Sequence, residues 1–329
     1  MRVAVIGAGS WGTALAILLA RKGASVGLFG RNTSDLATIR DLRENRHYLP
    51  GFSVPEGVEA ITGLGELGEA DLWVIAVPSP GIRWAASLIP ETPSKVVVAS
   101  KGLDGAGRLL GDVLSEVRPA AKLAALSGPN LAIEIVRGIP TAAVSASEDD
   151  EVAEYVRDAF IGPSYRVYLS NDRVGVELAG ALKNVLAIAA GISDGLGFGD
   201  NTKGALLARG LHEMTSLGLA MGSRVETFMG IAGVGDLFAT AASTLSRNYR
   251  VGRAIGEGAP LLEALDRVGQ VAEGVGTAEA AGKLASRHGI AMPVFEATRA
   301  VIHGQVGAAE AVEQLMERLP KREGFLRCP

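Results

Sequence analysis

The sequence is poor in the residues that build disulfides and metal sites. Its 329 residues include one cysteine, Cys328, and four histidines. A lone cysteine beside the C-terminus excludes an internal disulfide framework and argues against a catalytic thiol in a folded core. It is also typical of a reducing cytoplasm. No histidine lies at a metal-ligand spacing from another histidine or from the cysteine, so we expect no metal site.

Charge and long apolar runs are also limited. The net charge is −4 and no basic block stands out, so nucleic-acid binding has little electrostatic support. We expect no segment that spans a bilayer. The uncharged run from Val3 to Ala20 contains three glycines in six residues, which argues against a secretory signal peptide. With 48% apolar and 21% charged residues, the chain resembles an ordinary globular enzyme, and its length predicts two domains.

The most informative motif opens the chain. Val3–Ile6 is an apolar strand pattern that ends at the turn GAGSWG, and a helical pattern follows from Ser10 to Arg21. In a dinucleotide-binding unit, Gly7 would allow the tight turn, Gly9 would let a pyrophosphate approach the backbone, and Gly12 would let the helix pack closely. The first amides of the helix would face the phosphates. The segment therefore predicts the first half of a dinucleotide-binding fold.

Further apolar runs alternate with turns and helical patterns through the first half. The expected strands are 3–6, 26–29, 72–77, 95–99, 123–126, 141–146 and 165–169, with a helix at 35–43 and a long loop at 47–57. This alternation predicts an α/β fold with a doubly wound, mostly parallel sheet. Carboxyl ends of parallel strands share one edge of a sheet. The turns at 7–12, 30–32, 76–79, 100–102 and 127–130 should therefore line one crevice.

The second half is rich in alanine and leucine and has no convincing strand pattern. Residues 173–192 are apolar nearly all round, which predicts a buried central helix. Further helices are expected at 202–219, 248–255, 276–288, 293–303 and 308–318. We predict a dinucleotide-binding domain over residues 1–170 and an all-helical, substrate-binding domain over residues 171–329. The two domains should pack closely.

Lys183 is the sharpest catalytic candidate. An ammonium group inside an apolar helix is costly, so burial should push its pKa toward neutrality, where it can exchange a proton with a carbonyl or an alcohol. The alternative is a lysine whose head group reaches solvent. Asn184 beside it could orient the substrate or the lysine, or cap a neighbouring helix.

Other polar residues gather at predicted turns and helix starts. Lys101 follows a strand and would face the crevice, although loop lysines are often plain surface residues. Ser246 is typical of an N-cap, and Arg247 and Asn248 after it would suit an anion such as phosphate. The alternative is a solvated basic helix start. Asp236 is as readily an N-cap as a ligand.

Arg31 bears on the choice of cofactor. It stands about where an acidic residue would bind the ribose hydroxyls of NAD in this fold. An arginine there favours the 2′-phosphate of NADP, whereas Asp35 nearby keeps NAD open.

Nine motifs follow one another over essentially the whole chain: GAGSWGTALA, AVPS, SKG, SGPN, VELAGALKNVLAIAAGI, GLGFGDN, GVGDLFAT, SRNYRVG and GQVAEG. Together they resemble the NAD(P)-dependent glycerol-3-phosphate dehydrogenase family. The resemblance implies reversible hydride transfer between the cofactor and C2 of dihydroxyacetone phosphate, giving sn-glycerol 3-phosphate for phospholipid synthesis. It also implies that Lys183 is the proton donor and acceptor.

The same resemblance, with the reasoning above, assigns the binding residues. The substrate-binding residues are Lys101, Gly128, Asn130, Lys183, Asn184, Asp236, Ser246, Arg247 and Asn248. The cofactor-binding residues are Gly7, Gly9, Ser10, Trp11, Gly12, Arg31, Asn32, Lys101, Ala132, Arg247, Val271 and Glu273. One departure matters, because the family usually shows SGPSFA where this chain has SGPNLA at Ser127–Ala132. An amide thus replaces the hydroxyl at 130, and it can still donate and accept hydrogen bonds.

On this interpretation, the nicotinamide lies at the crevice between the domains, the substrate carbonyl near Lys183, and the phosphate at the helix start of Arg247. Two alternatives remain open. A β-hydroxyacid or 6-phosphogluconate-type dehydrogenase shares the domain plan and a helix lysine. A non-catalytic dinucleotide-sensing protein would bind cofactor without turnover, but it leaves the pairing of Lys183 with an anion site unexplained. The residues leave open whether the chain forms homo-oligomers.

Overall fold

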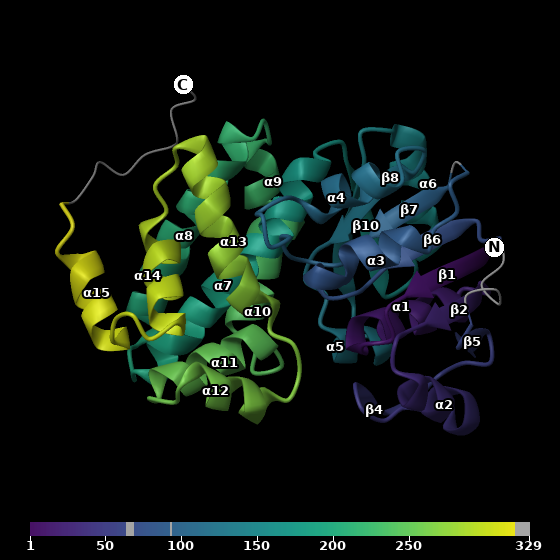
Figure 1. Ribbon diagram of the computed structural model, residues 1–329, viewed down its shortest axis with the longest axis horizontal. Helices are drawn as coiled ribbons and strands as arrows, with labels where there is room; N and C mark the ends of the chain where they lie inside the picture. Colours follow the sequence, from purple (N-terminus) through teal and green to yellow (C-terminus); the bar gives the residue numbers. More distant parts are fainter. Residues whose placement is uncertain (64–68, 93, 320–329) are drawn as a thin grey trace. The chain divides into compact units, whose positions relative to one another are not determined.

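The computed structural model describes residues 1–63, 69–92 and 94–319 (Figure 1). Cys328 therefore lies outside the described residues. The chain divides into two compact units. Unit 1 comprises residues 1–101 and 110–173, and unit 2 comprises residues 102–109 and the chain from 174 onward. The eight-residue segment Gly102–Leu109 belongs to unit 2 although both of its chain neighbours belong to unit 1, an excursion that we did not predict.

Unit 1 is built on an eight-stranded sheet among the described residues. Its strands are β1 (Arg2–Ile6), β2 (Ser25–Phe29), β5 (Val58–Ile61), β6 (Leu72–Ile75), β7 (Lys95–Val98), β8 (Lys122–Ser127), β9 (Thr141–Ala146) and β10 (Tyr165–Ser170). Their order is β10-β9-β8-β7-β6-β1-β2-β5, and every neighbouring pair is parallel except β8 and β9. The predicted mostly parallel sheet is confirmed, and β5 is a strand that we did not predict.

Helices cover both faces of this sheet. They are α1 (Ser10–Arg21), α2 (Thr33–Leu42), α3 (Ile82–Ser87), α4 (Leu110–Val117), α5 (Ala132–Val136) and α6 (Asp150–Phe160), with the short turn η2 (Ser79–Gly81). Strand β1 shows the double winding, because Val3 and Val5 join the core under α1, α2 and α6. Its alternate residues Ala4 and Ile6 join the core under α3 and α4. A strand buried on both faces has no polar alternation, as its sequence predicted.

The predicted loop at 47–57 is partly wrong. Leu49–Ser53 forms β4, which pairs antiparallel with β3 (Glu44–Asn45). The pair Pro50-Gly51 is typical of a turn. In the structure, however, Leu49 is buried and begins a short strand that includes both residues. The buried Asn45 side chain donates hydrogen bonds to the Ala8 carbonyl (2.9 Å) and to the Thr13 hydroxyl (2.8 Å). The hairpin therefore braces the glycine turn after β1.

Unit 2 is helical. Its helices are α7 (Arg173–Gly195, of which Arg173 belongs to unit 1), α8 (Asp200–Ala220), α9 (Val225–Met229), α10 (Asp236–Ala241), α11 (Arg247–Gly256), α12 (Leu261–Val268), α13 (Glu273–His288), α14 (Pro293–Ile302) and α15 (Ala308–Met316), with the π-helical turn η3 (Ile231–Gly235) (Figure 1). The predicted helices are confirmed, whereas α9, α10 and α12 were not predicted individually.

Helix α7 is the buried centre of unit 2, as predicted. Residues 175–193 are all buried. Glycines bring α7 and α11 together, since a Cβ on Gly191 would lie 2.1 Å from the Tyr249 carbonyl oxygen, and one on Gly252 would lie 2.0 Å from the Ile188 oxygen. By length and composition alone, α7 is apolar enough to cross a membrane. Its most apolar window is wholly buried inside the protein, as in a core helix.

Candidate active site

The carboxyl edge of the sheet in unit 1 has a switch point between β1 and β6. From β1 the chain continues to β2 and β5 on one side, and from β6 to β7 and β8 on the other. Ligands of doubly wound sheets bind outside the strand ends at such a point. Gly7 follows β1 there with φ +121°, and a Cβ on it would lie 2.3 Å from the Ala76 carbonyl oxygen beyond β6. Only glycine fits this turn.

Gly12 has the close approach to the turn that we predicted, whereas the phosphate contact of Gly9 stays a prediction. A Cβ on Gly12 would lie 1.8 Å from the Gly7 carbonyl oxygen, so helix α1 can approach the turn only with glycine at this position. A Cβ on Gly9 would meet nothing within 4 Å, and no side chain caps α1 at this residue. Open backbone at an uncapped helix start suits a phosphate. Ser10 begins α1, and the indole of Trp11 donates a hydrogen bond to the Ala99 carbonyl (2.8 Å).

The turn after β2 carries the residues that bear on cofactor choice. Arg31 is exposed, and its guanidinium lies 5.7 Å from the ring centroid of Trp84. The Asn32 side chain accepts hydrogen bonds from the amides of Ser34 (3.0 Å) and Asp35 (3.4 Å), so it caps α2. The Asp35 side chain is only 11% exposed, and one of its carboxylate oxygens lies 3.4 Å from His47 Nδ1. The other is buried without a partner among the described residues. Arg31 is therefore better placed than Asp35 to meet a ligand.

The loop after β8 is held by side chains from three other segments. Lys101 Nζ donates to the Gly128 carbonyl (2.7 Å), and the Thr141 hydroxyl donates to the Pro129 carbonyl (2.7 Å). The Tyr165 hydroxyl donates to Asn130 Oδ1 (2.9 Å). Asn130 Nδ2 and Ser127 Oγ are buried without a partner in the described part of the chain. The structure thus brings Lys101, Gly128 and Asn130 together, and Ala132 begins α5 directly after them.

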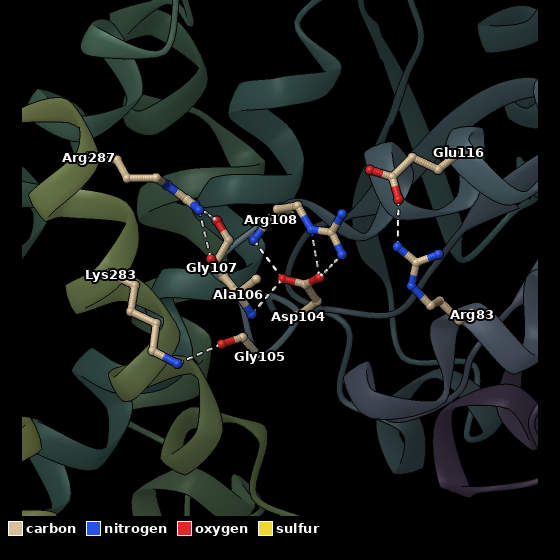
Figure 2. A network of polar contacts seen from close by, with 9 residues as sticks. All are labelled: Arg83, Asp104, Gly105, Ala106, Gly107, Arg108, Glu116, Lys283 and Arg287. Carbon is tan, nitrogen blue, oxygen red and sulfur yellow. Dashed lines mark hydrogen bonds and ion pairs between the residues drawn. The ribbon is translucent and has the colours of Figure 1, made fainter.

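The segment after Lys101 is anchored within unit 2 (Figure 2). Leu103 and Leu109 are buried in the helical core. On α13, Lys283 donates to the Gly105 carbonyl (2.8 Å) and Arg287 to the carbonyls of Ala106 (2.8 Å) and Gly107 (2.5 Å). Two cations one helical turn apart therefore hold three successive carbonyls.

The turn of this segment is closed by an ion pair between Arg108 and Asp104, with Nη2 2.6 Å from Oδ2 (Figure 2). Burial alone would raise the pKa of Asp104. The hydrogen bonds from the Arg108 side chain and backbone nevertheless hold that pKa below its usual value. Arg83 and Glu116, also drawn in Figure 2, form an exposed pair of unit 1.

Lys183 lies in the core of unit 2 with 6% of its surface exposed, so the alternative of a solvated head group is wrong. Its Nζ lies 3.0 Å from Asp236 Oδ1 and donates to the Thr240 hydroxyl (2.6 Å). Asp236 is 1% exposed and does not cap α10, because the N-cap is Gly235 and no side chain caps the helix there. Lys183 therefore has a carboxylate and a hydroxyl as partners inside the core of unit 2.

Thr240 is a site residue that sequence reasoning missed. Its hydroxyl donates to the Asp236 carbonyl (2.7 Å) and lies 3.2 Å from Asp236 Oδ1. The signal available in the sequence was the spacing of Asp236 and Thr240, because residues four apart on a helix lie on the same face. Lys183, Asp236 and Thr240 form one buried polar cluster, which we call the lysine cluster.

The start of α11 has the predicted cap. Ser246 Oγ accepts a hydrogen bond from the Tyr249 amide (3.2 Å). Arg247 is partly buried, and its Nη1 approaches Gln270 Oε1 at 3.4 Å. This contact places residues 270–273 beside the start of α11. Within that segment, Val271 is 54% exposed and Glu273 begins α13.

Asn248 is buried, which overturns the alternative that it belongs to a solvated surface. Its Nδ2 donates to Asn184 Oδ1 (2.9 Å), and its Oδ1 accepts from the Gly274 amide (3.0 Å). Asn184 and Asn248 thus contact each other and join α7, α11 and α13. Their predicted contacts with substrate stay predictions.

No three His, Cys, Asp or Glu side chains within residues 1–63, 69–92 and 94–319 lie together in a way that could hold a metal ion. Each unit thus contributes two groups of candidate site residues. In unit 1 they are the glycine turn after β1, which suits a phosphate, and the loop after β8. In unit 2 they are the lysine cluster and the capped basic start of α11.

Comparison with known proteins gives the family. The family model for the NAD-dependent glycerol-3-phosphate dehydrogenase N-terminus matches residues 2–153, and that for the C-terminus matches residues 172–313. A glycerol-3-phosphate dehydrogenase (NAD(P)+) of Desulfitobacterium hafniense is 45% identical over 98% of this chain and 93% of its own length. One of Moorella thermoacetica is 46% identical over 96% of each chain.

A solved structure agrees with these matches. The glycerol-3-phosphate dehydrogenase of Coxiella burnetii superposes with a TM-score of 0.93 at 37% identity, covering 96% of this chain and 99% of that one. The chain therefore belongs to the NAD-dependent glycerol-3-phosphate dehydrogenase family.

Proposed function

We propose that the protein catalyses the reversible NAD(P)H-dependent reduction of dihydroxyacetone phosphate to sn-glycerol 3-phosphate. The observation that carries the proposal is the lysine cluster, in which Lys183 is buried against Asp236 and Thr240. Lysine is rarely buried unless it is paired or has a function. A buried ammonium group that contacts a carboxylate and a hydroxyl is placed to give and accept a proton. The family to which the chain belongs supplies the reaction class.

Unit 1 would hold the cofactor, which supplies or accepts the hydride when it is bound. Gly9 and the first amides of α1 would bind its pyrophosphate, because the backbone there is open and uncapped. We propose that Arg31 binds the 2′-phosphate of NADPH, and so favours NADP over NAD. Asp35 competes poorly for the ribose because its side chain is largely buried toward His47.

Lys183 would act as the general acid in the reducing direction. Its Nζ gives a proton to the C2 oxygen of dihydroxyacetone phosphate as that carbon is reduced, and takes the proton back in the oxidising direction. Asp236 stabilises the ammonium before the transfer, and Thr240 fixes Nζ at the cluster. The three residues thus hold and orient a single proton.

The start of α11 would bind the substrate phosphate. The helix begins at Arg247 and has the positive end of its dipole there, and Arg247 adds a guanidinium that can form two directed hydrogen bonds. Asn248 stabilises this site through its hydrogen bonds to Asn184 and Gly274. A dianion at this position is recognised by charge and by geometry together.

We assign cofactor binding to residues 1–170, substrate binding and proton transfer to residues 171–329, and further substrate contacts to Lys101, Gly128 and Asn130 of the first range. The product suits phospholipid synthesis in the cytoplasm.

The test is oxidation of NADPH and of NADH, measured separately on addition of dihydroxyacetone phosphate. Turnover of this substrate, with little turnover of unphosphorylated dihydroxyacetone, supports the proposal. If the protein instead prefers a β-hydroxyacid or 6-phosphogluconate with the oxidised cofactor, the proposal is wrong and the protein is a dehydrogenase of that other type. Cofactor binding without turnover of any of these substrates would indicate a dinucleotide sensor.

A further inference from the structure

Tyr165 and Asn130 meet although 35 residues separate them. Tyr165 is the first residue of β10 and is 1% exposed. Strand β10 runs parallel to β9, and β9 runs antiparallel to β8. The start of β10 therefore lies at the same edge of the sheet as the end of β8, where Asn130 follows. This is the edge at which doubly wound sheets bind their ligands.

The Asn130 amide has one satisfied and one unsatisfied end. Its Oδ1 accepts the hydrogen bond from the Tyr165 hydroxyl at 2.9 Å. Its Nδ2 is buried and has no hydrogen-bond partner among the residues that the structure describes. Buried donors in folded proteins almost always have an acceptor, since leaving one unpaired costs free energy. At a ligand-binding edge, a bound molecule can supply the missing acceptor.

We propose that Tyr165 is a positioning residue for substrate binding. By donating to Oδ1, its hydroxyl turns the Asn130 amide so that the NH2 group is left to donate to an oxygen of the phosphorylated three-carbon substrate. This inference rests on the proposed function. A serine hydroxyl at position 130 would rotate freely between donor and acceptor roles. An amide has two different ends and needs a partner that fixes which end faces the ligand.

The decisive experiment compares the wild type with Tyr165→Phe, Asn130→Ser and the double variant. The readouts are KM and kcat for dihydroxyacetone phosphate and, by calorimetry, the Kd of glycerol 3-phosphate. Tyr165→Phe should raise KM and Kd by about three- to tenfold, as expected for one neutral hydrogen bond, with kcat within about twofold. In the Asn130→Ser background the same change should have no further effect, because no amide remains to be turned.

Tyr168→Phe is the matched control. Tyr168 lies on the same strand, is 45% exposed, and keeps its ring contact with Arg166 after loss of the hydroxyl. Its KM and Kd should equal those of the wild type. An equal effect of Tyr165→Phe with and without the Asn130 amide would show that Tyr165 only packs. Unchanged KM and Kd in both single variants would show that the Asn130 amide does not contribute to substrate binding. Either result overturns the proposal.

Asn130→Asp tests the proposal without altering Tyr165. The variant keeps an acceptor for the Tyr165 hydroxyl but replaces the NH2 donor by a negative oxygen. It should therefore weaken glycerol 3-phosphate binding by at least about tenfold. Binding like the wild type would overturn the proposal even if Tyr165→Phe failed to fold. Wild-type protein that binds glycerol 3-phosphate but does not reduce dihydroxyacetone phosphate would refute the proposed function alone. Protein that binds neither compound would refute both.

Discussion

Lys183 and Asp236 form an ion pair inside unit 2, with Nζ 3.0 Å from Oδ1 and both residues more than nine-tenths buried. A buried pair is sensitive to loss of one partner, since the remaining charge then lacks both water and a counter-charge. We therefore expect the pair to affect two quantities that can be measured separately. One is the rate of proton transfer in the reaction, and the other is the stability of the core of unit 2.

Lys183→Met should lower kcat by about 10²- to 10⁴-fold, the usual contribution of general acid catalysis, while cofactor affinity changes by no more than a few-fold. It should also destabilise the fold by about 3–5 kcal/mol, because the Asp236 carboxylate is left unpaired. The measurements are steady-state kinetics, cofactor binding and urea unfolding. Adding Asp236→Asn should restore much of the stability and none of the kcat. A single variant that keeps more than half of kcat would remove Lys183 from the mechanism.

Arg247→Ala should lower kcat/KM for dihydroxyacetone phosphate by at least about tenfold, because hydrogen bonds to a charged group are worth about 1.5–3 kcal/mol. Arg247→Lys should be intermediate, since it keeps the charge and loses the fork. Arg250 is the matched control, being exposed on the same helix with a long contact (3.5 Å) to the Arg267 carbonyl. Arg250→Ala should leave kcat/KM near the wild-type value. Equal losses with unphosphorylated dihydroxyacetone would assign Arg247 to the cofactor or the fold.

Local patterns in the sequence predicted the turn at Gly7–Gly12 and helix α7, because glycine spacing and an all-round apolar helix depend only on neighbouring residues. They did not predict the contacts that complete the site. The Asn45 side chain reaches Ala8 from the β3–β4 hairpin, and Thr240 reaches Lys183 from another helix. The segment Gly102–Leu109 joins unit 2 through cations on α13, nearly 180 residues away. Such contacts depend on how the whole chain packs, and the sequence pattern around a residue does not predict its distant partner.

The same reasoning explains the residues that had two interpretations. Asp236 and Asn248 both stand at helix starts, where capping, surface exposure and ligand binding give the same local pattern. Burial excludes the surface interpretation for both residues, since Asp236 pairs with Lys183 and Asn248 bonds Asn184 and Gly274, and their ligand contacts stay predictions.

Arg31→Asp should weaken NADPH binding more than NADH binding, because it replaces an attraction to the 2′-phosphate by a repulsion. The measurement is the Kd of each cofactor by fluorescence titration. Arg137→Asp is the matched control, because Arg137 is also exposed and lies 5.8 Å from the Phe52 ring, much as Arg31 lies against Trp84. The control should change neither Kd. Equal weakening of both cofactors by Arg31→Asp would mean that this arginine does not read the phosphate.

Glu213 is a buried carboxylate on α8 that caps another helix. Both of its oxygens accept the Val294 amide (3.0 and 3.1 Å), and one accepts the Phe295 amide (3.3 Å), at the start of α14. Burial is the largest influence and raises the pKa of Glu213 to about 7. The two amides and Arg209 oppose the rise, and Glu296 adds to it. Between its ordinary value of 4.5 and about 7, the folded protein therefore binds more protons at this residue than the unfolded chain does.

Glu213 should consequently make the protein less stable as pH rises through this range. Its contribution is full below about pH 4.5 and is lost by about pH 7, and it changes little above that value. Glu213→Gln cannot titrate, so the difference in free energy of unfolding between wild type and variant should fall over this window. The fall should be on the order of 3 kcal/mol, since each tenfold change in proton affinity is worth about 1.36 kcal/mol. Urea unfolding of both proteins at several pH values measures it. The Gln side chain also weakens the cap by a constant amount, so the slope with pH is the decisive quantity. Parallel curves would show that folding does not raise the pKa of Glu213, and that the residue acts on α14 only as a fixed cap.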